Sequence, residues 1–230
     1  MIAEGFAPPA RPRDASVRHL RGPAIVDHHR AMDSRWAYIA AFALMIVAWV
    51  TFFALFAFRR SAAGAPTAKM ERVSIVGIVI QGVAFGAVWM LQRRPWFSPV
   101  VPLPGALALL PPLLACVLAI ASVWLARTAI GTLGREWSLQ ARLVEGHRLV
   151  TAGPYGLVRH PIYTAMLGML VAQGVTVSHW IGLVGALPLF ALGTWIRVHS
   201  EEKLLRGQFG AAYEAYARRV PAVVPLRFGG

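Results

Sequence analysis

Long apolar runs separated by short polar segments dominate this chain. They cover residues 36–58, 73–91, 106–126, 161–177 and 180–198, and they contain few charged side chains. A helix needs about 20 mainly apolar residues to cross a bilayer. The pattern therefore predicts an all-α fold, a polytopic membrane helical bundle with about five transmembrane helices.

The polar segments suggest three parts of the chain. Residues 1–35 hold six Arg and several Pro, so we expect a mostly disordered or surface-lying tail. No apolar core lies near Met1, so the tail is not expected to be a cleavable signal peptide. Residues 36–135 should form the first three transmembrane helices. Residues 136–230 should form two further transmembrane helices and a C-terminal helix, and the motifs described below make this part of the chain the expected cofactor-binding catalytic region.

Composition supports a membrane protein. Hydrophobic residues make up 57% of the chain and charged residues 14%, against roughly 25% charged residues in soluble domains. The net charge is +13, but no basic patch is interleaved with aromatics, so we expect contact with membrane lipids and not with nucleic acid. The single Cys116 excludes an intramolecular disulfide and a cysteine metal cluster. His28 and His29 lack partner ligands, so no metal site is expected.

The distribution of Lys and Arg predicts an orientation. With five spans, the first loop, the third loop and the C-terminus share one side and hold 15 of these residues, against eight on the other side. The positive-inside rule places the more basic side in the cytoplasm. We therefore predict a multi-pass protein whose active site lies on the cytoplasmic side.

The chain changes character after Ser200. Leu205, Phe209, Tyr213 and Tyr216 recur at spacings of four, four and three residues, which indicates one apolar face of an amphipathic helix. We expect this helix to begin near Glu201 and to lie at the interface or dock beneath the polar loop that contains residues 147–163, where it would cap a cofactor site.

The most polar internal stretch is HRLVTAGPYGLVRHPIY, residues 147–163. A Gly-Pro turn, two Arg, two His and two Tyr lie between apolar runs, where polar groups must be satisfied or used. Pro161 suits the first position of a helix. The alternative is an interface loop in which Arg snorkels and Tyr anchors the chain.

A second polar pair lies one helical hairpin later. Arg197 and Glu201 are four residues apart and so share a helix face. They could form a surface ion pair of little energetic weight. Alternatively, Arg197 could hold a carboxylate while Glu201 binds hydroxyl or amino groups of a cofactor.

The two polar blocks together resemble a known family. GPYGLVRHPIY is similar to the Gly-x-Tyr…Arg-His-Pro-x-Tyr signature of the isoprenylcysteine carboxyl methyltransferase family. RVHSEEKLLRGQFGAAYEAYARRVP is similar to its second block, and the likeness extends over about residues 140–225. It implies an integral membrane methyltransferase that uses S-adenosyl-L-methionine and acts on a lipophilic or lipidated substrate.

The resemblance also implies functional residues. Arg197 matches the Arg that the family places beside the substrate carboxylate, and we take Arg197 and Glu201 as the catalytic pair. Ala165 replaces a Gly that is usual in the family, a change of one small residue for another. The cofactor contacts carried over from the family are Gln140, His147, Arg148, Leu149, Val150, Tyr155, His160, Pro161, Ile162, Tyr163 and Glu201.

Several acceptors and functions stay open. Methyl transfer from a sulfonium is an in-line displacement, and a carboxylate is already ionised and needs no general base. A thiol or amine would first lose a proton, for which His147 or His160 could serve. Relatives that methylate small thiols or phospholipid amines give one alternative. An NADPH-dependent sterol-type reductase and a non-enzymatic membrane protein are the others.

Overall fold

A helical bundle accounts for most of the chain. The computed structural model describes residues 23–57, 67–137, 142–144 and 148–225. Its α-helices are α1 (Pro23–Ala57), α2 (Ser74–Met90), α3 (Leu110–Leu133), α4 (Pro161–Val177), α5 (Trp180–Phe209) and α6 (Ala211–Arg219). Short 3₁₀ helices cover Gly105–Leu109, Gly134–Glu136 and Gly153–Gly156, and two strands, β1 (Thr67–Met70) and β2 (Arg142–Val144), pair antiparallel.

A helix lies at each of the five predicted apolar runs, and the predicted membrane helical bundle is confirmed. The segments Arg35–Ala57, Gly105–Leu133 and Trp180–Phe209 are long and apolar enough to cross a membrane. α2 and α4 are also apolar but have 17 residues each, which is about 26 Å at the helical rise of 1.5 Å per residue. That these two helices span a bilayer stays a prediction.

Three predicted boundaries are wrong. α1 begins at Pro23, 13 residues before the predicted start at residue 36, and residues 1–22 of the predicted tail lie outside the described residues. α3 runs on to Leu133, beyond the predicted end at residue 126. α5 continues through Ser200 to Phe209, and the separate amphipathic helix begins only at Ala211.

The physical reason for the long α5 is that its polar residues are buried within protein. Arg197, Ser200 and Glu202 are each about 5% exposed, so their charges and hydroxyls meet protein partners and need not end the helix at the lipid boundary. The break comes instead at Gly210, whose φ of +49° is a conformation that glycine adopts without a steric penalty.

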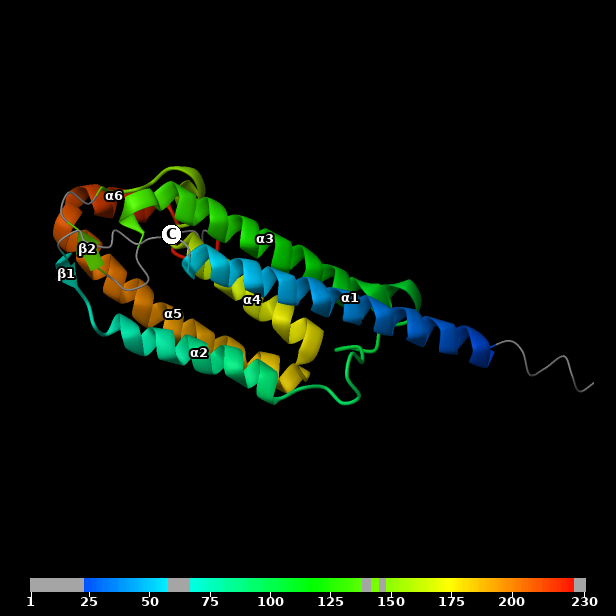
Figure 1. Cartoon of the computed structure of the whole chain (residues 1–230). Coiled ribbons are helices and arrows are strands. Elements are labelled where there is room, and N and C mark those ends of the chain that lie inside the picture. Colours follow the sequence, from blue (N-terminus) through cyan, green and yellow to red (C-terminus); the bar gives the residue numbers. More distant parts are fainter. Residues whose placement is uncertain (1–22, 58–66, 138–141, 145–147, 226–230) are drawn as a thin grey trace, which may run out of the picture.

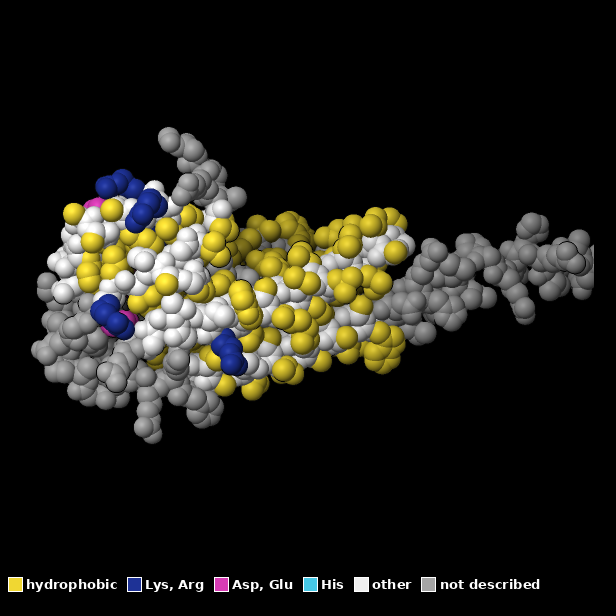
Figure 2. Space-filling view, turned by 90° about the horizontal axis from the view of Figure 1, so that it is seen from above, with side chains coloured by type: hydrophobic (Ala, Val, Ile, Leu, Met, Phe, Trp, Pro, Cys, Tyr) yellow, Lys and Arg dark blue, Asp and Glu magenta, His cyan; other side chains and the backbone are white. Residues whose placement is uncertain are grey.

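The helices pack in two antiparallel pairs. α2 packs along α5, and α3 packs along α4, with α1 resting on α3 and α4. Figure 1 shows these helices side by side, with β1, β2 and α6 gathered at one end of the bundle. The space-filling view in Figure 2 shows hydrophobic side chains over much of the bundle, whereas the visible Lys and Arg side chains lie toward the end with α6. This separation suits a body in lipid and one end in water.

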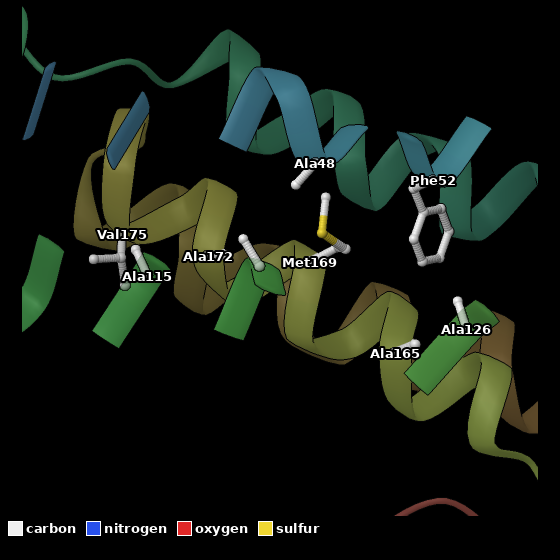
Figure 3. Packing of buried hydrophobic residues seen from close by; sticks show 9 residues of the cluster. Ala48, Phe52, Ala115, Ala126, Ala165, Met169, Ala172 and Val175 are labelled. Carbon is white, nitrogen blue, oxygen red and sulfur yellow. The ribbon is translucent and has the colours of Figure 1, made fainter. Parts of the chain in front are cut away.

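Small side chains let the second pair and α1 approach closely. Ala115 and Ala126 of α3 face a cluster on α4 that includes Ala165 and Met169, and Phe52 of α1 closes it (Figure 3). A Cβ added at Gly168 of α4 would lie 2.2 Å from the hydroxyl oxygen of Ser122 on α3. Small residues at such contacts are typical of membrane helices, because apolar side chains gain nothing by leaving lipid and association relies on close packing.

The end of the bundle away from α6 is held by a buried arginine. Arg93 is 6% exposed and donates hydrogen bonds to the carbonyl oxygens of Val175 (3.0 Å), Thr176 (2.7 Å) and Ser178 (2.5 Å) at the C-terminus of α4. A cation at this helix end satisfies carbonyls that lack helical partners and opposes the helix dipole. Arg93 thus connects the end of α2 to the end of α4.

Candidate functional site

A cavity of about 510 Å³ opens within the bundle toward its α6 end. Its walls come from α1 to α6, with α3 contributing its last residue, and from the segment between α3 and α4. All ten predicted site residues that the structure describes line this cavity: Arg148, Leu149, Val150, Tyr155, His160, Pro161, Ile162, Tyr163, Arg197 and Glu201. Gln140 and His147 lie outside the described residues. Two blocks that are separated by a helical hairpin in sequence thus share one space.

His160 sits between two glutamates of α5. Its Nδ1 lies 3.3 Å from Glu201 Oε2, and its Nε2 lies 3.2 Å from Glu202 Oε1. His160 precedes α4, whose first residue is Pro161, so the helix start fixes the backbone from which the ring projects. The imidazole therefore ties the polar loop to the end of α5.

The pKa of His160 reflects these contacts. Burial alone would lower the pKa, but the hydrogen bonds and negative charges of Glu201 and Glu202 outweigh it and raise the pKa above its usual value of 6.5. The raised pKa extends the range over which His160 is protonated to higher pH, and the imidazolium helps to neutralise two adjacent carboxylates.

Arg159 and Glu202 form a second connection between the polar loop and α5. Glu202 Oε1 accepts hydrogen bonds from Arg159 Nε (3.0 Å) and Nη2 (2.8 Å), and its Oε2 accepts one from Arg206 Nη2 (2.9 Å). Arg159 Nη1 also donates to the carbonyl oxygen of Ala217 at 2.9 Å. The buried Glu202 therefore holds the loop, α5 and α6 together through charge-assisted hydrogen bonds.

The residues that follow α6, and α6 itself, also form hydrogen bonds with the polar loop. The backbone N–H of Arg159 donates to the carbonyl of Pro221, and that of His160 to the carbonyl of Ala222, each at 2.8 Å. The Tyr216 hydroxyl of α6 donates to the carbonyl oxygen of Tyr155 at 2.6 Å. α6 thus docks beneath the polar loop, as predicted. Burial raises the pKa of Tyr216 to about 12, so this hydroxyl keeps its proton.

Tyr163 and Arg197 meet across the cavity wall. The guanidinium carbon of Arg197 lies 4.7 Å from the centroid of the Tyr163 ring, and the Tyr163 hydroxyl donates to Glu201 Oε1. Arg197 Nη1 donates to the side-chain oxygen of Gln81 on α2 at 3.0 Å. The two residues predicted to be catalytic therefore both contact Tyr163, from successive turns of α5.

The sequence did not reveal the apolar wall. Its aromatic residues come from α1 and α2: Trp49, Phe52, Phe53, Phe56 and Phe85. No sequence signal distinguishes such residues from lipid-facing or core aromatics in a membrane helix. The cavity wall thus combines cationic and anionic side chains with aromatic ones, so it is suited to a charged ligand beside an apolar one.

Two further polar wall residues, Gln81 and Glu136, were also missed, whereas Arg159, which lines the wall too, belongs to the motif but was not among the predicted cofactor contacts. Gln81 had a signal, since it is a single amide within the apolar run of residues 73–91, and polar residues inside membrane helices are commonly functional. Glu136 follows α3, and its carboxylate oxygen lies 3.9 Å from Arg148 Nε. Glu136 and Glu201 give the cavity wall carboxylates that can meet a cationic ligand.

Residues 113–207 match the sequence model of the isoprenylcysteine carboxyl methyltransferase (ICMT) family. Protein-S-isoprenylcysteine O-methyltransferase B of Arabidopsis thaliana is 37% identical over 108 residues, which cover 44% of this chain and 53% of the relative. The chain thus spans about half the length of this relative.

Two bacterial relatives are also similar to a part of this chain. Cobalt-zinc-cadmium resistance protein CzcN of Cupriavidus metallidurans is 38% identical over 101 residues, or 42% of this chain and 45% of the relative. Methanethiol S-methyltransferase 2 of Bradyrhizobium diazoefficiens is 37% identical over 89 residues, or 37% of this chain and 32% of the relative.

Proposed function

Because residues 113–207 match the model of the isoprenylcysteine carboxyl methyltransferase family, we propose that this chain is a membrane methyltransferase of that family and that it uses S-adenosyl-L-methionine. The acceptor is a lipophilic molecule with an anionic head, in the first instance the carboxylate of an isoprenylcysteine-like compound. The observation that carries the proposal is the single cavity, which joins the two polar blocks to an aromatic wall.

The residues of the cavity fit the cofactor. S-adenosyl-L-methionine carries a positive sulfonium, an ammonium and ribose hydroxyls, which suit carboxylate partners. Glu201 and Glu136 line the polar part of the cavity, while Arg148 can meet the cofactor's own carboxylate. Leu149, Val150 and Ile162 offer apolar surface for its adenine. When bound, the cofactor supplies a methyl group on a positively charged sulfur.

The protein's own contribution is alignment and desolvation. Arg197 would bind the acceptor carboxylate and hold it toward the cofactor side of the cavity. Glu201, fixed by Tyr163 and His160, would hold polar groups of the cofactor in place. The aromatic residues of α1 would exclude water and surround the apolar part of the acceptor. Such alignment of two reactants can lower a barrier by several kcal/mol.

A carboxylate acceptor is favoured over a thiol or an amine because Arg197 is a buried cation in the wall. A carboxylate benefits from a guanidinium partner, whereas an amine acceptor would be repelled in its charged form. The similarity to a methanethiol S-methyltransferase supports a small thiol as the second candidate. Following the positive-inside rule, the cavity opens toward the cytoplasm.

Cofactor choice is tested first. Purified protein in detergent should bind S-adenosyl-L-methionine in isothermal titration calorimetry. Binding of NADPH without binding of S-adenosyl-L-methionine would support a reductase and overturn the proposal. Glu201→Gln should weaken cofactor binding. Glu214→Gln, which changes a half-exposed carboxylate of α6 away from the cavity wall, should leave it unchanged.

The acceptor is tested next by transfer of a labelled methyl group. We expect transfer to N-acetyl-farnesylcysteine, abolished in Arg197→Ala and retained in Arg218→Ala, which changes an exposed arginine of α6. Transfer to a short alkanethiol or to phosphatidylethanolamine, without transfer to the prenylcysteine, would replace the carboxylate by one of the alternative acceptors.

A further inference from the structure

The crossing of α2 and α5 rests on two glycines that face each other. A Cβ added at Gly77 would lie 2.6 Å from the carbonyl oxygen of Gly193, and one added at Gly193 would lie 2.8 Å from that of Gly77. Both contacts are shorter than real Cβ atoms tolerate, so the two backbones approach closely only because both residues are glycine.

Each glycine also makes room for a long polar side chain of the other helix. A Cβ at Gly77 would lie 2.5 Å from Cγ of Arg197, and one at Gly193 would lie 2.9 Å from Cγ of Gln81. Gln81 is four residues after Gly77, and Arg197 is four residues after Gly193. On antiparallel helices this spacing places each side chain over the opposite glycine, and the two polar heads meet between them.

The amide of Gln81 has a defined orientation. Its Nε2 donates to Thr194 Oγ1 at 2.8 Å, and its Oε1 accepts from Arg197 Nη1 at 3.0 Å. Turning the amide over would direct its NH₂ group at the guanidinium, donor against donor. Thr194 thus fixes the amide, and the amide fixes one edge of the guanidinium. Gln81 is 2% exposed to solvent yet lines the cavity beside Arg197.

We propose that Gln81, held by Thr194, is the positioning residue that orients the Arg197 guanidinium in the cavity wall, where an anionic acceptor head would meet it. An uncharged amide anchors the guanidinium by a hydrogen bond, whereas a carboxylate at the same place would also neutralise it. The inference rests on the proposed function, in which Arg197 meets the acceptor. α2 lies outside the segment of residues 113–207 that matches the family.

The test compares binding of two probes that differ in charge. N-acetyl-farnesylcysteine and its methyl ester are titrated into the detergent-solubilised protein without methyl transfer. The wild type should bind the acid at least tenfold more tightly than the ester. Gln81→Glu should remove that preference, because the introduced carboxylate would pair with Arg197. Gln81→Leu and Thr194→Val should reduce it by smaller factors, because the guanidinium then loses its fixed orientation.

Gln173→Leu is the matched control. Gln173 is also a buried glutamine of the bundle, where it accepts from Trp49 Nε1 at 3.0 Å and donates to the carbonyl of Phe85 at 3.1 Å. It does not line the cavity, so its loss should lower the thermal midpoint and keep the preference for the acid. An unchanged preference in Gln81→Glu would overturn the inference. So would a loss of preference in Gln173→Leu equal to that in Gln81→Leu.

The outcomes separate this inference from the proposed function. A wild type that binds S-adenosyl-L-methionine but shows no preference for the acid overturns the role of Gln81 and leaves a methyltransferase with another acceptor. A wild type that prefers the acid, loses the preference in Gln81→Glu and does not bind S-adenosyl-L-methionine overturns the proposed function and supports the role of Gln81.

Discussion

The Arg197 guanidinium lies over the ring of Tyr163, with 4.7 Å between its carbon and the ring centroid. Arg197 comes from α5 and Tyr163 from α4, so the contact joins the two sequence blocks. An aromatic face attracts the cation without neutralising it, in contrast to a carboxylate. The same tyrosine hydrogen-bonds Glu201. One side chain thus positions the group expected to face the acceptor and the group expected to face the cofactor.

Two substitutions of Tyr163 should separate these roles. Tyr163→Phe keeps the ring but removes the hydroxyl, so we expect weaker binding of S-adenosyl-L-methionine and little change in the acceptor KM. Tyr163→Leu removes both, and a cation–π contact is worth about 0.5–2 kcal/mol. The acceptor KM should therefore rise by a factor of roughly 2–30 as well. Equal acceptor KM values in the two variants, measured by methyl transfer, would show that the ring does not position Arg197.

The charge of His160 should make stability depend on pH. The folded-state pKa lies above the usual value of 6.5, because hydrogen bonds to Glu201 and Glu202 outweigh burial. The stabilisation is then fully present below pH 6.5 and is lost as the pH rises through the raised folded-state pKa. We expect the thermal midpoint in detergent to fall over that window above pH 6.5. His160→Asn should flatten the profile there, and an unchanged profile would contradict the assignment.

Glu202 should contribute more to stability than other carboxylates at this end of the bundle. Its side chain is 6% exposed and contacts Arg159, His160 and Arg206. Removing one partner of a buried charge network costs about 3–5 kcal/mol. Glu202→Gln should therefore lower the thermal midpoint strongly.

Glu214 provides the control for that measurement. It also pairs with Arg206, at 2.9 Å, but both side chains are more than 40% exposed. An exposed pair contributes at most about 1 kcal/mol, so Glu214→Gln should have a small effect. Comparable losses in the two variants, followed by circular dichroism in detergent, would show that the network around Glu202 does not hold this end together.

The sequence predicted the polar half of the site because its residues carry local constraints. Pro161 marks a helix start at the observed position, and His160 and Tyr163 follow from the same motif. The aromatic wall of the cavity depends on which face of α1 turns inward. From its residue type alone, Trp49 cannot be distinguished from a lipid-facing tryptophan. The start of the amphipathic helix was misplaced because Glu202 resembles a surface charge, whereas the fold buries it against Arg159.

The crossing of α2 and α5 predicts opposite effects for two glycines of one helix. Gly193→Ala would place a Cβ 2.8 Å from the carbonyl oxygen of Gly77, and overpacking of this kind costs about 1–3 kcal/mol. It should also displace Gln81 and weaken acceptor binding. Gly185 has no atom within 4 Å of an added Cβ, so Gly185→Ala should be neutral or stabilise the helix by about 0.5–1 kcal/mol. Thermal midpoints in detergent compare the two. Equal midpoints would mean that α2 and α5 do not cross at Gly77 and Gly193.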